Sequence, residues 1–185
     1  METVSLRDGR RPVLGVMGAG YAALADDVEL SERLGELAAR AGWAVLTGGR
    51  GSGVMSGACR GARRVPGSLT IGILPSPDDG DVSAYLDVAV FTGLGSARNA
   101  VNVISSDVVV ACGRGGPGTA AEVALAIKAG RPVVLLSPEP GAAAYFATLD
   151  PDLAVTGSAE EALAAATALL ARGRGPGCRS RSCPE

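Results

Sequence analysis

The stretch from Asp107 to Leu136 restricts the possible folds of this chain more than any other, because it contains the pattern strand, glycine turn, helix, strand. Its first segment, Asp107–Ala111, is a β-branched apolar run, which is typical of a strand buried on both faces. A helix is predicted from about Thr119 to Ala129, where glycine and proline end it. A second strand is predicted at Pro132–Leu136, so the unit predicts a parallel sheet.

Four glycines crowd the turn between this strand and this helix: Gly113, Gly115, Gly116 and Gly118. Glycine lets backbone N–H groups come close to a ligand because it has no Cβ. A helix N-terminus adds unpaired N–H donors and the positive end of the helix dipole. We therefore expect Gly115, Gly116, Gly118 and Thr119 to bind a phosphate or another oxyanion. Tight packing of the turn is the alternative.

The sequence leaves two roles open for Glu122. Thr119 and Glu122 have the T-x-x-E spacing of a capping box, in which Glu122 would cap the helix. Beside an anion-binding turn, the Glu122 carboxylate would instead serve catalysis. The spacing alone does not decide between capping and catalysis.

Strands and helices alternate along the rest of the chain. Further strands are predicted at Pro12–Met17, Trp43–Thr47, Ser68–Leu74, Val88–Thr92 and Ala154–Thr156. The alternation predicts one doubly wound, Rossmann-like α/β domain over residues 12–171, with a mainly parallel sheet of about six or seven strands and helices on both faces. Residues 1–11 are expected to form a flexible arm, and residues 172–185 a disordered tail.

Other turns between predicted strands and helices are also rich in glycine, and Gly18, Gly48 and Gly49 lie in two of them. The turn at Gly18 matches the dinucleotide pattern G-x-G-x-x-A, but the second strand ends in glycines instead of the acid that holds a ribose, so NAD binding is disfavoured. If the first six strands lay in the order 3-2-1-4-5-6, the ligand would bind between the first and fourth strands. We expect these three glycines to line that rim.

Two arginines are candidates for contact with an anion. Ser96 is a predicted N-cap, which places Arg98 in the first turn of a helix, where a cation opposes the dipole. At this position the charge of Arg98 would be stabilised most by a ligand phosphate or by a carboxylate such as that of Glu122. A surface position is the alternative. Arg50 lies in the turn after the second strand, where anion contact and simple solvation are equally compatible with the sequence.

The composition excludes several chemistries. The 185 residues include no histidine, which excludes histidine acid–base chemistry and histidine metal ligands. The only lysine, Lys128, is expected on the surface late in its helix, so a pyridoxal-phosphate enzyme is excluded. No metal site is expected, because Asp78, Asp79 and Asp81 are expected to lie in a solvated loop. The cysteine spacing fits neither a zinc site nor a redox pair, and Cys112 is expected in the core.

The formal net charge is −2, and no apolar run reaches transmembrane length. We therefore expect a cytoplasmic protein that binds neither membranes nor nucleic acid.

The segment Arg114–Glu122 (RGGPGTAAE) resembles the PGGxGTxxE motif of the LOG (Lonely Guy) family, long mislabelled "lysine decarboxylase-like". Gly48-Gly49, Gly53-Val54-Met55 and Ala97-Arg98-Asn99 match the same family in order. The resemblance covers about Val13 to Leu136 and is strongest to the branch that includes molybdenum-cofactor carrier proteins.

This resemblance implies a Rossmann-like fold, a homodimer or higher homo-oligomer, and a small phosphorylated ligand. LOG enzymes cleave the N-glycosidic bond of nucleoside 5′-monophosphates, and the catalytic residues here would be Arg98 and Glu122. The chain departs from the hydrolases at Arg114, which replaces the motif proline, and at Asn99, where they usually have lysine.

We therefore expect a protein that requires no cofactor and binds molybdenum cofactor or a nucleotide, with Asn99 among its contacts. The alternative is a phosphoribohydrolase acting on AMP or cytokinin ribotides.

Overall fold

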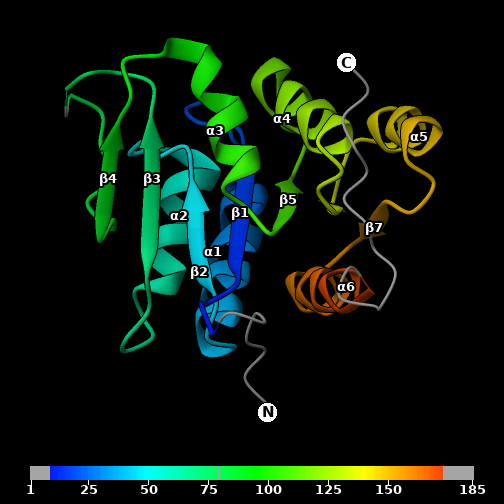
Figure 1. The fold of residues 1–185 in the computed structure, drawn as a ribbon, viewed down its shortest axis with the longest axis horizontal. Helices are drawn as coiled ribbons and strands as arrows, with labels where there is room; N and C mark the ends of the chain where they lie inside the picture. Colours follow the sequence, from blue (N-terminus) through cyan, green and yellow to red (C-terminus); the bar gives the residue numbers. More distant parts are fainter. Residues whose placement is uncertain (1–8, 79, 173–185) are drawn as a thin grey trace.

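Apolar strands alternate with helices and build a seven-stranded sheet with helices on both faces (Figure 1). A computed structural model describes residues 9–78 and 80–172. In chain order the elements are β1 (Val13–Gly18), α1 (Ala25–Arg40), β2 (Ala44–Thr47), α2 (Gly53–Ala62), β3 (Thr70–Leu74), β4 (Val88–Phe91), the 3-10 helix η1 (Gly95–Ala97), α3 (Arg98–Ile104), β5 (Val108–Cys112), α4 (Pro117–Lys128), β6 (Val133–Leu136), α5 (Pro140–Leu149), β7 (Ala154–Thr156) and α6 (Ala159–Arg172). The predicted single doubly wound α/β domain is confirmed.

The strands lie in the order β4-β3-β2-β1-β5-β6-β7, and all pairings between them are parallel. The expected order, with the strand Val88–Thr92 beside the first strand, is wrong: β4 pairs with β3 at the edge of the sheet, with Val88 opposite Ile71. The connection between these parallel strands contains no helix among its described residues, and it adds β4 directly outside β3. The crossover through α3 then leads to β5 beside β1, which makes the β1–β5 boundary the topological switch point.

The core has two layers because alternate residues of each strand face opposite sides of the sheet. Val108 and Val110 face the layer that contains α1, α2 and α6, whereas Val109 and Ala111 face α3, α4 and α5. Figure 1 shows α3 in front of the sheet and α1 and α2 behind it.

The helices α1 and α2 approach each other closely at two glycines. A Cβ on Gly35 would lie 2.0 Å from the carbonyl oxygen of Ala58, and one on Gly61 would lie 1.8 Å from that of Glu32. Both distances are far below van der Waals contact, so the backbones meet only because these side chains are absent.

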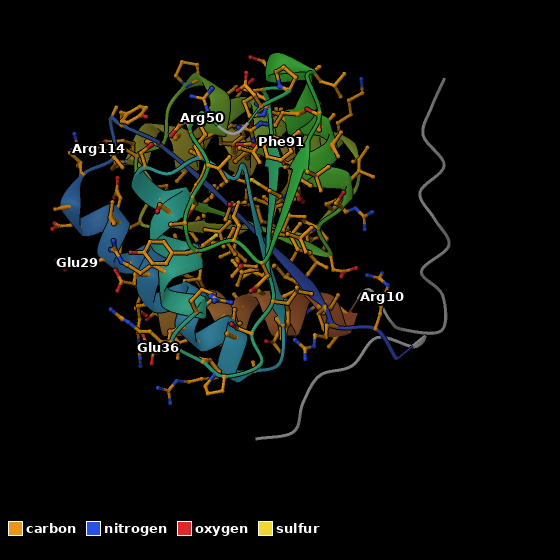
Figure 2. The ribbon with its side chains drawn as sticks, turned by 90° about the vertical axis from the view of Figure 1, so that its left-hand side faces the viewer. Arg10, Glu29, Glu36, Arg50, Phe91 and Arg114 are labelled. Carbon is orange, nitrogen blue, oxygen red and sulfur yellow. The ribbon has the colours of Figure 1, made fainter. Side chains whose placement is uncertain are left out.

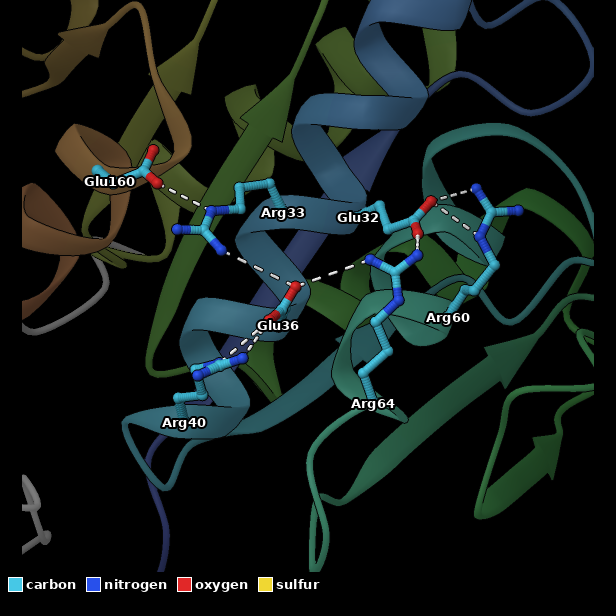
Figure 3. A network of polar contacts seen from close by, with 7 residues as sticks. All are labelled: Glu32, Arg33, Glu36, Arg40, Arg60, Arg64 and Glu160. Carbon is cyan, nitrogen blue, oxygen red and sulfur yellow. Dashed lines mark hydrogen bonds and ion pairs between the residues drawn. The ribbon is translucent and has the colours of Figure 1, made fainter.

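An ion-pair network joins α1, α2 and α6 on the surface (Figure 3). Glu32 of α1 pairs with Arg60 of α2 and with Arg64 just after that helix, while Arg33 of α1 donates to Glu160 of α6 at 2.8 Å. Exposed ion pairs contribute only about 0–1 kcal/mol each, so the glycine contact is the stronger determinant of the spacing between α1 and α2.

Most of the expected arm and tail lies outside the described residues. At the described end of the arm, Arg10 donates to the Asp107 carboxylate at 3.1 and 3.2 Å, and Arg11 donates to the carbonyl of Gly67 at 2.8 Å. Within residues 9–78 and 80–172, none of the helices has the length and apolar character needed to cross a membrane.

Candidate functional site

The carboxyl ends of β1, β2 and β5 open into a cleft of about 310 Å³ beside the switch point. Residues from the end of β1, from the three turns that follow β1, β2 and β5, and from α2, α3 and α4 line it: Met17, Gly18, Ala19, Gly20, Tyr21, Ala22, Gly48, Arg50, Met55, Arg98, Asn99, Gly115, Gly116, Gly118, Thr119 and Glu122. In Figure 2, Arg50 and Arg114, which follow β2 and β5, lie toward the same end of the molecule, away from Arg10. The structure thus gathers turns that are far apart in the sequence.

Almost all the residues predicted to form the site line this cleft. They are Gly18, Gly48, Arg98, Asn99, Gly115, Gly116, Gly118, Thr119 and Glu122. The exception is Gly49, whose φ is +76° and whose Cβ, if present, would lie 2.8 Å from Cγ of Leu74. Its N–H donates to the Thr47 hydroxyl at 3.1 Å, so Gly49 shapes the turn and does not line the cleft.

The N-terminus of α4 faces the cleft without a side-chain cap. The helix begins at Pro117 with Gly116 as N-cap and no side-chain cap, so of the two roles left open for Glu122, the capping box with Thr119 is not formed. Proline favours the first helical position, and it starts the helix two residues earlier than expected. The first-turn N–H groups of a helix have no intrahelical acceptor, so Gly118 and Thr119 offer donors to a ligand.

The turn before α4 is held from the other side by α1. The buried carboxylate of Asp27 accepts from the N–H of Arg114 at 3.4 Å, and a Cβ on Gly113 would lie 2.1 Å from Cγ of Asp27. Arg114, which departs from the family motif, turns outward and pairs with Glu139 at 2.7 Å.

Arg98 is buried at the floor of the cleft, with 8% of its surface exposed. The predicted N-cap at Ser96 is wrong, because η1 runs directly into α3 and the N-cap position is Ala97 without a side-chain bond. A Cβ on Gly48 would lie 2.3 Å from Nη1 of Arg98, so the glycine leaves room for the guanidinium. Burial lowers the pKa of Arg98, Glu122 opposes this shift, and the positive charge of Arg50 adds to it.

The carboxylate of Glu122 lies beside this guanidinium. Its Oε1 is 3.7 Å from Nη1 of Arg98 and accepts a hydrogen bond of 2.8 Å from Nδ2 of Asn102. Burial raises the pKa of Glu122, whereas Asn102 and Arg98 act in the opposite direction. Nε of Arg98 and Oδ1 of Asn102 are buried without a hydrogen-bond partner in the described structure, which leaves one donor and one acceptor unused near the cleft.

The sequence did not reveal the role of Asn102 as the partner of Glu122. The spacing indicates only that Asn102 lies on the same face of α3 as Arg98, because it follows Arg98 by four residues. Tyr21, Met17 and Met55 also line the cleft without having been assigned to it.

Arg50 is exposed at the mouth of the cleft, with its Nε 4.0 Å from the carboxylate of Asp81. It is therefore both solvated and within the lining. Lys128 lies exposed in the last turn of α4, as expected. In the described parts of the chain, histidine, cysteine and acidic residues form no group of three or more that could hold a metal ion.

The predicted core position of Cys112 is confirmed. Burial raises the pKa of Cys112 to about 12 and that of Cys59 to about 11, so both thiols stay protonated. Cys178 and Cys183 lie outside the described residues.

A doubly wound parallel sheet with a cleft at its switch point defines a Rossmann-like protein with the usual ligand-site geometry of that class. The chain belongs to the SLOG cluster4 family, whose model matches residues 11–167. The resemblance to the LOG superfamily is thereby confirmed.

Solved structures confirm the predicted branch. The molybdenum cofactor binding protein of the phototrophic bacterium Rippkaea orientalis is 45% identical, with a TM-score of 0.84 over 87% of this chain and 98% of that chain. The molybdenum cofactor carrier protein MCP of Chlamydomonas reinhardtii is 47% identical, with a TM-score of 0.82 over 88% of this chain and 99% of that chain. An uncharacterized protein of Archaeoglobus fulgidus is 38% identical over 125 residues, which are 68% of this chain and 80% of that protein.

Proposed function

We propose that this protein binds a phosphorylated pterin- or nucleotide-like ligand in the cleft and acts as a carrier of molybdenum cofactor. The observation that carries the proposal is the meeting of Arg98 with the uncapped N-terminus of α4 in one cleft. Two solved structures resemble this chain over nearly the whole described domain. One is a molybdenum cofactor binding protein and the other is a molybdenum cofactor carrier protein, which supports the choice of ligand.

The cleft has the donors that a phosphate group requires. In the proposal, the phosphate accepts from the first-turn N–H groups of α4 and from the guanidinium of Arg98, which lines the cleft. The lining carries two cations, Arg98 and Arg50, and one carboxylate, Glu122, so its charge balance favours an anion. Asn99 supplies a neutral polar group for the rest of the ligand.

The test is to measure what co-purifies with the protein from cells that make molybdenum cofactor. Molybdenum is quantified by mass spectrometry and pterin by fluorescence after oxidation. Gly116 has extended backbone angles and no atom within 4 Å of a built Cβ, so Gly116→Val fits the fold while filling the cleft. We expect wild type to carry both molybdenum and pterin, and Gly116→Val to carry at least about tenfold less, equivalent to ~1.4 kcal/mol of binding free energy.

Gly141→Val is the matched control, because Gly141 in α5 is equally unobstructed and does not line the cleft. It should retain wild-type occupancy. The carrier proposal fails if wild type contains neither molybdenum nor pterin, or if Gly116→Val retains as much of both as Gly141→Val does.

One observation favours the phosphoribohydrolase alternative. Glu122 lines the cleft with a pKa raised by burial, and such a carboxyl suits general acid–base chemistry. Incubation with AMP and cytokinin ribotides separates the two functions. We expect no release of free base; steady release that Glu122→Ala abolishes would replace the carrier proposal with the hydrolase.

Two other expectations stay predictions. Self-association into a homodimer or higher homo-oligomer is favoured by exposed apolar side chains on β4 and just after it, namely Val88, Val90, Phe91 and Leu94. The cytoplasmic location inferred from the sequence also stays a prediction.

A further inference from the structure

Tyr21 is the only aromatic residue among those that line the cleft. Its side chain is 79% exposed, although it stands at the mouth of a site that is otherwise built largely from glycine, methionine and arginine. The flanking residues Gly20 and Ala22 carry little or no side chain, so one face of the ring is open to a ligand.

The backbone that carries Tyr21 is fixed at both ends of its turn. The N–H of Ala23 donates to the carbonyl of Gly20 at 3.0 Å, which closes a turn with Tyr21 inside it. The carbonyl of Ala19, just before this turn, accepts from the N–H of Val54 at 3.0 Å and ties the segment to α2. Tyr21 therefore projects from a defined turn.

The hydroxyl of Tyr21 is held by a neighbouring turn. It donates to Oδ1 of Asp81 at 3.2 Å, and the N–H of Gly51 donates to the same oxygen at 3.3 Å. The backbone of Asp81 is also held, because its carbonyl accepts from Gly51 at 3.2 Å. This anchoring limits the motion of the ring and lowers the entropy lost when a ligand packs on it.

We propose that the Tyr21 ring is the surface on which the planar heterocycle of the ligand stacks, with Asp81 positioning the ring through its hydroxyl. The inference rests on the proposed function and adds to it the part of the ligand that this side of the cleft recognises. Met55 lines the same cleft, and its polarizable thioether suits contact with a flat ring. The phosphate is recognised separately, at Arg98 and the N-terminus of α4.

The test compares three probes by titration calorimetry: AMP, neopterin monophosphate and ribose 5-phosphate. The first two join a heteroaromatic ring to a phosphate, and the third has the phosphate without a ring. Loss of a stacked base costs a factor of roughly 5 to 150 in affinity. Tyr21→Ala should weaken at least one ring-bearing probe by such a factor and leave ribose 5-phosphate unchanged.

Tyr21→Phe separates stacking from the hydroxyl contact, because it keeps the ring and loses the bond to Asp81. It should weaken the ring-bearing probe less than Tyr21→Ala does. Tyr145→Ala is the matched control, since Tyr145 is 60% exposed on α5 outside the cleft, and it should bind as wild type.

Equal weakening of ribose 5-phosphate and the ring-bearing probes by Tyr21→Ala would overturn the stacking proposal, as would unchanged binding of all probes. A Tyr21→Phe variant as weak as Tyr21→Ala would also overturn it. Each of these three results leaves the proposed function standing if the wild-type protein binds a probe. Failure of wild type to bind any of the three probes would contradict the proposed function together with the inference.

Discussion

Glu122 and Arg98 are a buried pair whose geometry is looser than that of a strong salt bridge. Their closest atoms are 3.7 Å apart, and Nε of Arg98 has no partner. Desolvation is the largest cause of the pKa shift of both residues: it raises the pKa of the carboxyl and lowers that of the guanidinium. A pair that is incompletely satisfied by the protein is suited to receive an additional charged group from a ligand.

This imbalance predicts that Glu122→Gln stabilises the ligand-free protein. The folded pKa of Glu122 lies above its unfolded value, so the folded state binds the extra proton and loses stability as pH rises from about 4.5 through the folded pKa. Glutamine resembles the protonated form and avoids that loss. Thermal unfolding should show a higher Tm for Glu122→Gln at about pH 7 and little difference from wild type near pH 4.

Glu160→Gln is the control for this measurement, because Glu160 is exposed and Arg33 lowers its pKa. It should not raise the Tm at about pH 7. A Glu122→Gln variant less stable than wild type at that pH would mean that the pairing with Arg98 outweighs burial.

The glycines and Arg98 could be predicted from the sequence because their roles depend on local features: a turn that needs open backbone, and a cation placed where it opposes a helix dipole. The spacing of Asn102 from Arg98 indicates only a shared face of α3. It does not reveal the hydrogen bond to Glu122, because that bond joins α3 to α4, which follow different strands. The contact between Tyr21 and Asp81 spans 60 positions of sequence and has no local signal.

At the scale of elements, competing local rules decided where α4 begins. The T-x-x-E spacing favoured a start at Thr119, whereas Pro117 at the first helical position favours an earlier start, and the structure follows the proline. The consequence is functional: the cap position falls on Gly116, and no side chain covers the end of the helix that faces the cleft.

The contact between α1 and α2 gives a stability prediction at the same scale. Gly35→Ala would place a methyl group 2.0 Å from the carbonyl oxygen of Ala58, so the helices must separate. We expect a loss of about 1–3 kcal/mol in the free energy of unfolding, measured by chemical denaturation.

Gly141→Ala in α5 is the matched control, since nothing lies within 4 Å of its added methyl group. It should leave stability unchanged or raise it by up to ~1 kcal/mol, because alanine is the better helix former. Equal effects of the two substitutions would show that the close approach of α1 and α2 does not matter for stability.

For the whole molecule, the predicted strand order was wrong, yet the predicted gathering of the turns agrees with the structure. In an all-parallel sheet, the turns that follow the strands lie at one edge whatever the order of the strands. Order decides only which turns are neighbours, and it placed the Gly115–Thr119 turn after β5 beside the turn after β1. Sequence could not fix that order, because the position of β4 depends on a connection without a helix.

The central claim is that these turns hold a phosphorylated ligand at the switch point, and a crystal structure of the loaded protein tests it most directly. We predict the phosphate within about 2.7–3.2 Å of the N–H groups of Gly118 and Thr119 and of the guanidinium of Arg98. A ligand whose phosphate lies elsewhere, with Arg98 still paired only to Glu122, would contradict the account.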